Sequence, residues 1–580
     1  MDNRRNMFLA FGLSMIVVLG WTFISERYFP QPKAAVQTPA QQAAAAALPA
    51  ANAVAAKPRA VAVVKAESPR IAIETPTLKG SINLKGARID DLVLSAYHQE
   101  LPKTSPSVVL YAPEGTAQSA LAGFGWVGQS VSVPAPDTLW QADGTKLTPE
   151  TPVTLTWDNK AGQVFSLKVT VDKSYMFSVT QSVANHGAAP IALASYAYVS
   201  RNHPAIDTAS AAHVGPVGAF NGKVNYDINY VNLDGQEAGF FGKLFGSSAK
   251  AGENNFPSMG GWVGFGDKYW LSAIIPDQNT KLNAGFRKDG AEYRAGYAGA
   301  ATIIAPNATQ STTAHLFSGA KEVDVVDGYE NRLGITHFGK SIDWGWFEII
   351  CKPFFRLIDW LFKLTGNFGV AIILTTFVVR LFMFPIAQRQ FASMATMRVA
   401  QPKIKALQER HKDDKTALQQ ATMQLYKEEK INPVSGCLPI FLQIPVFYAL
   451  YKVLSLSIEM RHQPFALWLH DLSAPDPMFF GLTPGLTAML PSFLALGILP
   501  ILLGITMWAM QKLNPAPTDP AQAQMMMIMP WMMMFFFAPL AAGLQLYYVV
   551  SNILTILQQR WLYSKHPAMQ QPPAALKAVK

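Results

Sequence analysis

The sequence predicts a membrane α-helical bundle of six transmembrane helices joined to a large exported domain, an antiparallel β-sandwich. Three observations support this fold class. Half of the 580 residues are apolar and only 15 % are charged, whereas charged residues make up about a quarter of a typical soluble domain. Long apolar runs lie at the N-terminus and after residue 366. Between them, short alternating runs are broken by Gly, Asn, Asp and Pro, which is typical of strands and turns.

The N-terminal segment, residues 1–29, contains an apolar run, 7–24, that is long enough to cross most of a ~30 Å hydrocarbon core. No small-x-small cleavage site follows this run, which favours an uncleaved anchor over a signal peptide. Because Arg4 and Arg5 precede it, we expect a cytoplasmic N-terminus and export of the residues that follow. Residues 30–66 are rich in Ala, Pro and Gln and predict a flexible linker.

In residues 67–340, short runs of alternating apolar and polar residues predict one large antiparallel sandwich. Apolar and polar residues alternate over 164–171, a polar stretch interrupts them at 172–174, and apolar residues resume at 175–179, which predicts a β-hairpin. The sequence of this region shows no nucleophile elbow, metal cluster or phosphate loop. Two cysteines in the whole chain also exclude a disulfide framework and a Cys-based zinc site. We therefore expect a structural or binding module.

Residues 341–365 predict an amphipathic helix. Charged residues three or four positions apart share one face of it: Glu348, Lys352, Arg356, Asp359 and Lys363. Large apolar residues occupy the other face. Such a helix would lie flat in the outer headgroup region of a bilayer, and packing against the sandwich is the alternative.

Residues 366–563 are predicted to form a five-helix membrane core. Its apolar segments are residues 367–387, 435–455, 489–511, 525–540 and 544–562. The connection 388–433 carries nine Lys and Arg residues, whereas the connection 456–488 carries only Arg461. By the positive-inside rule the first connection is cytoplasmic and the second is outside, so both termini, including the tail 564–580, are expected in the cytoplasm.

The cytoplasmic connection 388–433 is itself expected to fold. Two helical stretches flank a polar turn at residues 411–415, and the second ends before Asn432 and Pro433. This pattern predicts an antiparallel helical hairpin. Its basic residues are either docking positions or ordinary positive-inside charge: Lys403, Lys405, Arg410, Lys412 and Lys415.

Arg380 is a charged residue inside the first of these five spans, about 21 Å from its outer end. A charge near the centre of a membrane helix costs on the order of 2.5 to 3.5 kcal/mol. Guanidinium stays protonated, so the cost cannot be avoided by losing the charge. The side chain must therefore be solvated by polar groups, or it must reach toward the inner headgroups.

Polar residues on neighbouring spans are candidates for that solvation. Thr376 lies one turn from Arg380, and Gln443 lies in the next span, residues 435–455. The last span carries a polar stripe at helical spacing: Gln545, Tyr548, Ser551, Asn552 and Thr555. Such residues are most simply satisfied around a wet cavity, although hydrogen bonds between helices are an alternative for Ser551 and Thr555.

The five C-terminal spans contain no Asp or Glu. Proton-driven transport normally needs a titratable group in the bilayer, so this absence disfavours it. Without an acidic partner, the charge of Arg380 is available to a visiting anion, such as a carboxylate on a polypeptide that enters from the cytoplasm. The span at residues 525–540 is rich in Met, which suits a surface that accepts varied apolar partners.

Six short motifs then resemble the YidC/Oxa family of membrane protein insertases, in its Gram-negative form. They fall in order at residues 375–380 (TTFVVR), 401–404 (QPKI), 432–437 (NPVSGC), 443–447 (QIPVF), 465–473 (FALWLHDLS) and 543–552 (GLQLYYVVSN). The resemblance implies an inner-membrane insertase and chaperone, not an enzyme, with no catalytic residues, metal or cofactor. Its implied partners are nascent integral membrane proteins, the Sec translocon, the ribosome and the signal recognition particle pathway. The net charge of +10 adds anionic phospholipids to the expected partners, and DNA is not expected among them.

The resemblance also implies a hydrophilic groove that opens to the cytoplasm and to lipid. Arg380 matches the groove arginine, and Thr376, Gln443, Tyr548 and Ser551 match groove positions, to which the polar stripe adds Asn552. Residues 67–340 match a periplasmic, supersandwich-like domain, and 388–433 match a mobile cytoplasmic element. A polar tail of the substrate would enter the groove while its apolar segment slides into lipid outside the spans at residues 435–455 and 525–540. Candidate contacts for that slide are Phe447, Met529 and Met533.

Two other functions remain open from the sequence. A small-solute transporter or channel with an exported sensing domain would show solute flux in liposomes. A carbohydrate-active sandwich with a membrane anchor would lose its function when residues 80–320 are deleted, whereas an insertase would keep nearly normal activity.

Overall fold

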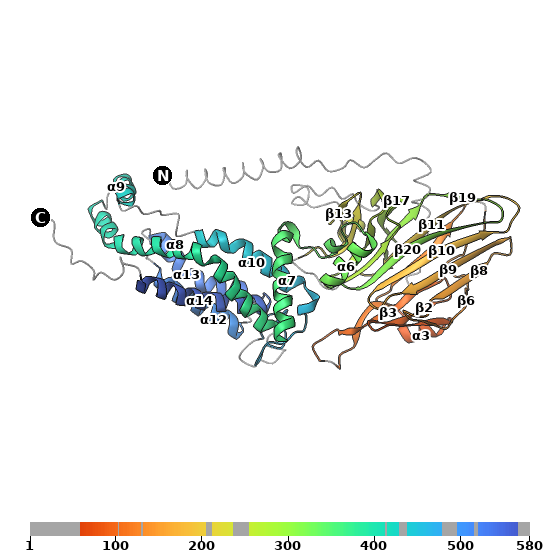
Figure 1. Ribbon diagram of the computed structural model, residues 1–580, viewed down its shortest axis with the longest axis horizontal. Coiled ribbons are helices and arrows are strands. Elements are labelled where there is room, and N and C mark those ends of the chain that lie inside the picture. The colour runs from red at the N-terminus through yellow and green to blue at the C-terminus, as the bar shows by residue number, and fades with distance from the viewer. Residues whose placement is uncertain are drawn as a thin grey trace. The chain divides into compact units, whose positions relative to one another are not determined.

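The computed structural model describes residues 58–102, 104–128, 131–204, 212–235, 254–411, 414–428, 438–477, 496–514 and 520–565. The chain divides into two compact units with a boundary after Ile342, apart from a short stretch at 100–103 that groups with the second unit. Strands make up most of the first unit and helices most of the second (Figure 1). The expected anchor 1–29, the linker up to residue 57 and the tail from residue 566 lie outside the described residues.

Two β-sheets form the first unit. Within the described residues the larger sheet has eleven strands, in the spatial order β14 (Asn254–Met259), β17 (Lys281–Asp289), β18 (Glu292–Gly299), β11 (Ile191–Arg201), β5 (Ala120–Val127), β3 (Arg88–His98), β2 (Leu78–Asn83), β1 (Arg70–Glu74) and β7 (Lys146–Leu147), with β19 (Thr302–Ile304) beside β11 and β4 (Ser107–Tyr111) beside β3. All neighbours are antiparallel except β1 and β7.

The smaller sheet has nine strands in the described part of the chain. Their spatial order is β13 (Lys223–Asn225), β12 (Gly215–Phe220), β15 (Trp262–Gly266), β16 (Trp270–Ile275), β20 (Ala308–Ala320), β10 (Met176–Asn185), β9 (Gln163–Val171), β8 (Val153–Asp158) and β6 (Gln141–Ala142). Short helices accompany the sheets: α3 (Val61–Ala66), α4 (Tyr230–Leu233), α6 (Val323–Leu333) and the 3-10 turn η1 (Phe338–Ser341).

The predicted hairpin at residues 164–179 is confirmed by β9 and β10, which pair antiparallel with Val171 opposite Phe177. Asp172 sets the turn, because its carboxylate accepts hydrogen bonds from the backbone N–H groups of Ser174 (2.9 Å) and Met176 (3.1 Å). Alternate residues of β9 are buried, which places the apolar face of the hairpin against the other sheet.

The two sheets pack through a core of large apolar side chains. Trp126 of β5 meets Phe165 of β9 edge to face, with ring centroids 5.2 Å apart. The amide of Gln181 in β10 also crosses the core and donates to the backbone carbonyl of Gly125 in β5 at 2.8 Å. This buried polar contact fixes how β10 lies over β5, because an amide nitrogen without its acceptor would be costly there.

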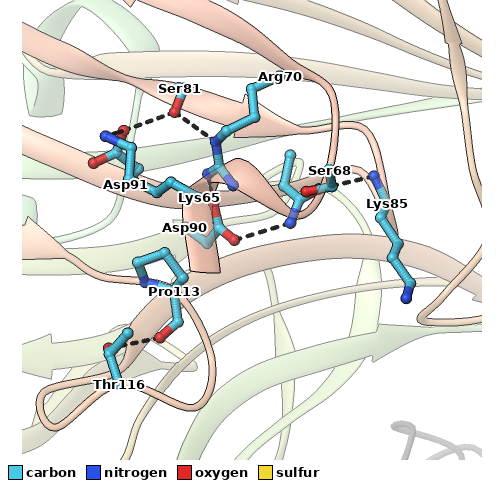
Figure 2. Close-up of polar contacts among 10 residues, drawn as sticks. Lys65, Ser68, Arg70, Ser81, Lys85, Asp90, Asp91, Pro113 and Thr116 are labelled. Atoms are coloured by element: carbon cyan, nitrogen blue, oxygen red, sulfur yellow. Dashed lines mark hydrogen bonds and ion pairs between the residues drawn. The ribbon is translucent and has the colours of Figure 1, made fainter. Parts of the chain in front are cut away.

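A buried polar network joins α3 and β1 to the bulged strand β3 (Figure 2). Asp90 is the extra residue of a β-bulge, where Ser81 faces Asp91 and the next pairing skips to Ile89. Arg70 pairs with Asp90 and donates through Nε to Ser81 at 2.8 Å, and Ser81 donates to Asp91 at 2.7 Å. Burial raises the pKa of Asp90, and Arg70 opposes that rise.

Lys65 of α3 pairs with the same Asp91 at 2.5 Å. This contact corrects the expected linker, because residues 61–66 form a helix that is tied to the sheet. The composition of 30–66 could not reveal this ion pair, since its partner lies in a distant strand.

The second unit is helical. In the described residues it contains the 3-10 turns η2 (Gly345–Phe347) and η4 (Ile458–Met460) and the helices α7 (Glu348–Thr365), α8 (Phe368–Arg410), α9 (Lys415–Glu428), α10 (Leu438–Leu456), α12 (Ile498–Leu513), α13 (Pro520–Phe537) and α14 (Ala542–Lys565). A sharp corner separates α7 from α8. Gly366 ends α7 in the left-handed conformation (φ 67°), and Asn367 caps α8 by accepting from the N–H of Val370 at 3.1 Å.

Helix α7 has both a buried and an exposed apolar stripe. Its buried residues are Cys351, Phe355, Ile358 and Leu361, and its exposed apolar residues are Ile349, Trp360 and Leu364. The charged residues pair along the helix, Glu348 with Lys352 at 3.1 Å and Asp359 with Lys363 at 2.6 Å. The helix therefore has two apolar surfaces, one packed inside the unit and one exposed.

A buried lysine ties the start of this region to α10. Lys452, only 6 % exposed, donates to the backbone carbonyl of Asp343 at 2.9 Å and lies 3.6 Å from its carboxylate. Close by, the rings of Phe347 and Tyr448 pack with centroids 4.9 Å apart. These contacts hold the residues before α7 against the end of α10.

The helix boundaries correct several predicted segments. Helix α8 does not end near residue 387 but continues to Arg410, so the first arm of the expected hairpin is the continuation of the span. Helix α12 begins at Ile498 instead of 489, with residues 478–495 outside the described part, and α13 ends at Phe537. Among the described residues, one helical segment, Phe368–Ala392, is long and apolar enough to cross a membrane, with a mean hydropathy of 2.2.

We expect the Arg70→Met variant to lower the free energy of unfolding of the β unit by about 3–5 kcal/mol, because it leaves the buried Asp90 without its cation. Hydrogen exchange of β1 to β3 in the full-length protein, followed through urea unfolding, measures the change. The control is Arg59→Met, which removes an exposed ion pair with Glu67 and should cost no more than about 1 kcal/mol. Equal losses in the two variants would contradict this role of Arg70.

Candidate functional site at Arg380

Arg380 lies in α8 and reaches across to α14. Its Nη2 donates to the hydroxyl of Ser551 at 2.5 Å and to the backbone carbonyl of Ser551 at 3.1 Å. Ser551 is 2 % exposed, so both acceptors are inside the helical unit. In the part of the chain that the structure describes, no carboxylate pairs with this guanidinium. The charge is therefore held by neutral oxygens alone.

A second polar contact lies between α10 and α14. The amide of Gln443 is 3.4 Å from the hydroxyl of Tyr547 and 3.5 Å from that of Tyr548. Both tyrosines lie in the neighbourhood of Arg380. Arg380, Gln443, Tyr548 and Ser551, which the sequence singles out, thus come together from three helices.

Sequence reasoning missed Tyr547, which is 1 % exposed and shares the contact with Gln443. Its spacing was the signal that could have found it, because a residue four positions before Ser551 lies on the same helix face.

Asn552 faces elsewhere. Its amide donates to the hydroxyl of Thr506 in α12 at 3.1 Å. Gln545 likewise donates to the backbone carbonyls of Phe537 (2.9 Å) and Leu540 (2.8 Å) at the end of α13. The polar stripe of α14 therefore divides, with Ser551 facing Arg380 and the two amides joining α14 to its neighbours. Thr555 donates back to the carbonyl of Ser551 at 2.7 Å.

Thr376 makes no hydrogen bond with Arg380. It is fully buried, and its hydroxyl donates to the carbonyl of Ile372 in its own helix at 2.8 Å. Its neighbour Thr375 is also fully buried, and within the described residues its hydroxyl finds no hydrogen-bond partner.

An open groove of about 540 Å³ lies between α8 and α14, beside Arg380. Its polar wall residues are Arg380 and Gln558, and the others are Phe377, Val378, Leu381, Phe384, Leu554, Leu557 and Trp561. The walls of this groove are thus largely apolar, which differs from the hydrophilic lining that we expected. The polar groups gather instead on the side of Arg380 that faces Ser551 and the tyrosines.

The expected slide residues are only partly accessible. Phe447 packs inside the unit, with ring centroids 5.9 Å from both Phe537 and Tyr548. Met529 and Met533 are half-buried. One stripe of exposed apolar side chains on α13 lies one position earlier, at Met525, Ile528, Met532 and Phe536, and Met527 and Trp531 are exposed beside it. Because α13 is apolar all round, its sequence carried no signal for which face is exposed.

The basic residues of the predicted hairpin lie where α8 ends and α9 begins. Lys403, Lys405 and Arg410 are exposed on the last turns of α8, and Ile404 between them is buried. Lys415 starts α9, and Lys412 lies outside the described residues.

Known proteins match nearly the whole length of this chain. The family model described as 60Kd inner membrane protein matches residues 360–570, and the YidC periplasmic domain matches residues 70–357. The membrane protein insertase YidC of Zymomonas mobilis subsp. mobilis is 43 % identical and aligns over 98 % of this chain and 96 % of its own length. The membrane protein insertase YidC of Rhizobium etli is also 43 % identical, and it aligns over 98 % of this chain and 96 % of its own length.

A solved structure of an active YidC insertase with its first transmembrane domain resolved covers 87 % of this chain and 94 % of its own length. Its identity to this chain is 15 % and its TM-score is 0.36. The sequence relatives by themselves are sufficient: this chain belongs to the YidC family of inner-membrane protein insertases, which are not enzymes and which carry a β-rich periplasmic domain.

Proposed function

We propose that Arg380 receives a polar, preferably acidic, segment of a nascent membrane protein inside the bilayer. The observation that carries this proposal is that, within the described residues, the guanidinium bonds only to the neutral oxygens of Ser551. Arg380 lies about 18 Å from the start of α8, more than halfway across a ~30 Å hydrocarbon core. A positive charge at that depth attracts a carboxylate more strongly than it would in water, because the surroundings screen it less.

The hydroxyls of Tyr547 and Tyr548 and the amide of Gln443 supply further polar groups beside this charge. A polar tail that leaves water would therefore meet several hydrogen-bonding partners instead of hydrocarbon. Insertion in this scheme needs no nucleotide. It is driven by burial of the apolar segment of the substrate and, for acidic tails, by the membrane potential at ~2.3 kcal/mol per charge per 100 mV.

The apolar segment of the substrate would pass along α13. The proposed contacts are the exposed side chains Met525, Ile528, Met532 and Phe536, with Met529 and Met533 at the margin of this stripe and Phe447 supporting it from inside. Methionine suits this role because its flexible, polarizable side chain adapts to different apolar partners.

We further propose six transmembrane spans with both termini in the cytoplasm, formed by residues 7–24, α8, α10, α12, α13 and α14. The length and apolarity of Phe368–Ala392 and the short apolar helices α12 and α13 support it. The exposed Ile349, Trp360 and Leu364 support an interfacial position of α7. The exposed Lys403, Lys405 and Arg410 would meet anionic phospholipid, the ribosome or the signal recognition particle pathway, and the Sec translocon would be a further partner.

Neither a solute transporter nor a carbohydrate-active enzyme is favoured, because the nearly full-length relatives are membrane protein insertases.

We expect Arg380→Ala to slow the insertion of substrates with acidic tails by about tenfold or more, because a hydrogen bond to a charged group is lost from the reception site. Arg380→Lys should keep part of the activity, since it preserves the charge but not the planar fork. Protease protection of labelled substrate in proteoliposomes measures the rate. Arg389→Ala is the matched control, because Arg389 is an exposed arginine of the same helix. Normal insertion by a folded Arg380→Ala protein would refute the electrostatic role.

A photo-crosslinker placed at Met532 should capture the apolar segment of a ribosome-bound nascent membrane protein. The same probe at Met534 should not, because Met534 is 9 % exposed whereas Met532 is 51 % exposed. The two positions share a helix and a residue type, so the comparison isolates the exposed face. Equal crosslinking from both positions, or none from Met532, would exclude this stripe as the path of the substrate.

A further inference from the structure

The apolar groove between α8 and α14 has no part in the insertion scheme proposed above. Three contacts join these two helices in the same order along both: Arg380 with Ser551, Phe384 with Trp561, and Phe391 with Tyr563. The helices therefore run side by side in the same direction (Figure 1). The volume of the groove, about 540 Å³, lies within the ~300–1,000 Å³ that is usual for a ligand site.

The depth of the groove follows from its wall residues on α8. Phe377 lies about 14 Å and Phe384 about 24 Å from the start of this helix, which is the inner half of a ~30 Å hydrocarbon core. This placement rests on the topology proposed above, in which α8 begins at the outer surface. The apolar wall is open to its surroundings, since Leu381 is 74 % and Leu557 is 59 % exposed. The groove therefore faces the acyl chains of the inner leaflet.

Two cations lie at the cytoplasmic end of the groove. The ammonium group of Lys565 is 5.1 Å from the centre of the Trp561 ring, which is part of the wall, and Arg560 is exposed one residue before Trp561. Within the described residues neither cation forms an ion pair. Helices α12, α13 and α14 contain no Asp or Glu, and α8 has only Glu409, next to its last residue. This end of the groove therefore carries positive charge that no neighbouring carboxylate of these helices balances.

An amide group lies between the apolar wall and these cations. Gln558 belongs to the wall, about one turn before Trp561, and its amide nitrogen is buried without a hydrogen-bond partner in the described part of the chain. A buried donor without an acceptor is costly, and an acceptor that enters the groove would remove this cost when the side chain turns toward it. Toward the cytoplasm, the groove thus offers apolar side chains, then an amide donor, and then two cations.

We propose that this groove binds one anionic phospholipid of the inner leaflet. An acyl chain lies along the apolar wall, an ester carbonyl accepts from Gln558, and the phosphate group meets Lys565 and Arg560. Basic sites between membrane helices on the cytoplasmic side are typical binding places for acidic lipid headgroups. A phospholipid has the same order of apolar, hydrogen-bond-accepting and charged groups as the groove requires.

A transmembrane helix fits the groove less well than a lipid does. The cytoplasmic end of a membrane helix usually carries Lys or Arg, and in this chain Arg4 and Arg5 precede the apolar run 7–24. A helix seated in the groove would therefore bring like charges to Lys565 and Arg560. An anionic lipid brings the opposite charge to the same place.

Lipid retention by the full-length protein in detergent tests the charged end of the site. Native mass spectrometry with phosphatidylglycerol and phosphatidylcholine of identical acyl chains should show one phosphatidylglycerol molecule bound about fivefold or more tightly. Lys565→Ala should weaken that binding about fivefold, because one cation near the headgroup is lost. Lys512→Ala is the matched control, since the ammonium group of Lys512 lies over the Trp508 ring at 5.6 Å and Trp508 is not part of the groove wall.

The apolar part of the site is tested without changing any charge. Leu557→Trp places a larger side chain in the groove and should lower the retention of phosphatidylglycerol to the level of phosphatidylcholine. Ile553→Trp is its control, because Ile553 is an exposed residue of α14 that does not line the groove. Thermal unfolding in detergent shows whether each variant remains folded.

A photo-crosslinker in place of Phe377 identifies the occupant in proteoliposomes of phosphatidylglycerol and phosphatidylethanolamine. We expect a lipid adduct, and capture of residues 7–24 or of a nascent substrate in its place would overturn the proposal. Equal retention of the two lipids by the wild type, or unchanged retention by folded Lys565→Ala and Leu557→Trp proteins, would overturn it as well. None of these measurements uses insertion, so they can fail while the role of Arg380 stands. A probe at Phe377 that captures no lipid would count against both this site and α8 as a span.

Discussion

The helical unit is organised around one unavoidable charge. A guanidinium cannot give up its proton, so α8 can lie in hydrocarbon only if another helix brings oxygen atoms to Arg380. Ser551 of α14 does so with its hydroxyl and its carbonyl, and this requires close contact between the two helices. Asn552, the neighbour of Ser551, then bonds to α12, and Gln545 bonds to the end of α13. The contact that solvates the charge and the contacts that assemble the bundle therefore lie on a single helix.

Sequence patterns predicted the family and the β-rich domain, because six motifs in a fixed order and the alternation of strands are strong signals. They were weaker for individual side chains. Helical spacing showed that Ser551 and Asn552 were both polar positions of one helix, but adjacent residues point about 100° apart, and only contacts with other helices decide their partners. The sequence could not show which face of α13 is exposed, because nearly every residue of this helix is apolar. The C-terminal end of α8 was misjudged, because basic residues indicate where a chain leaves the hydrocarbon and do not end a helix.

The periplasmic domain uses buried polar groups in two different ways. Around Asp90 every strong charge has a close internal counterpart in Arg70 or Lys65, so the network holds β1, β3 and α3 together. Around Tyr196 and Tyr198 neither hydroxyl has a hydrogen-bond partner within the described residues, and both side chains pack over glycines of β5. A β-sheet can support both arrangements because pleating separates the residues that pack the core from those on the opposite face.

The 43-residue length of α8 has a mechanical consequence. The stretch from Arg380 to Arg410 is about 45 Å long at 1.5 Å per residue, so a tilt of roughly 5° would swing its far end by about 4 Å. Pro385 interrupts this rod five residues beyond Arg380, because it cannot donate to the carbonyl of Leu381. A second proline, Pro402, lies farther along the helix, and between the two prolines Phe391 and Met394 pack against Tyr563 of α14. The last turns of α8, beyond Pro402, can therefore bend without disturbing the contact between Arg380 and Ser551.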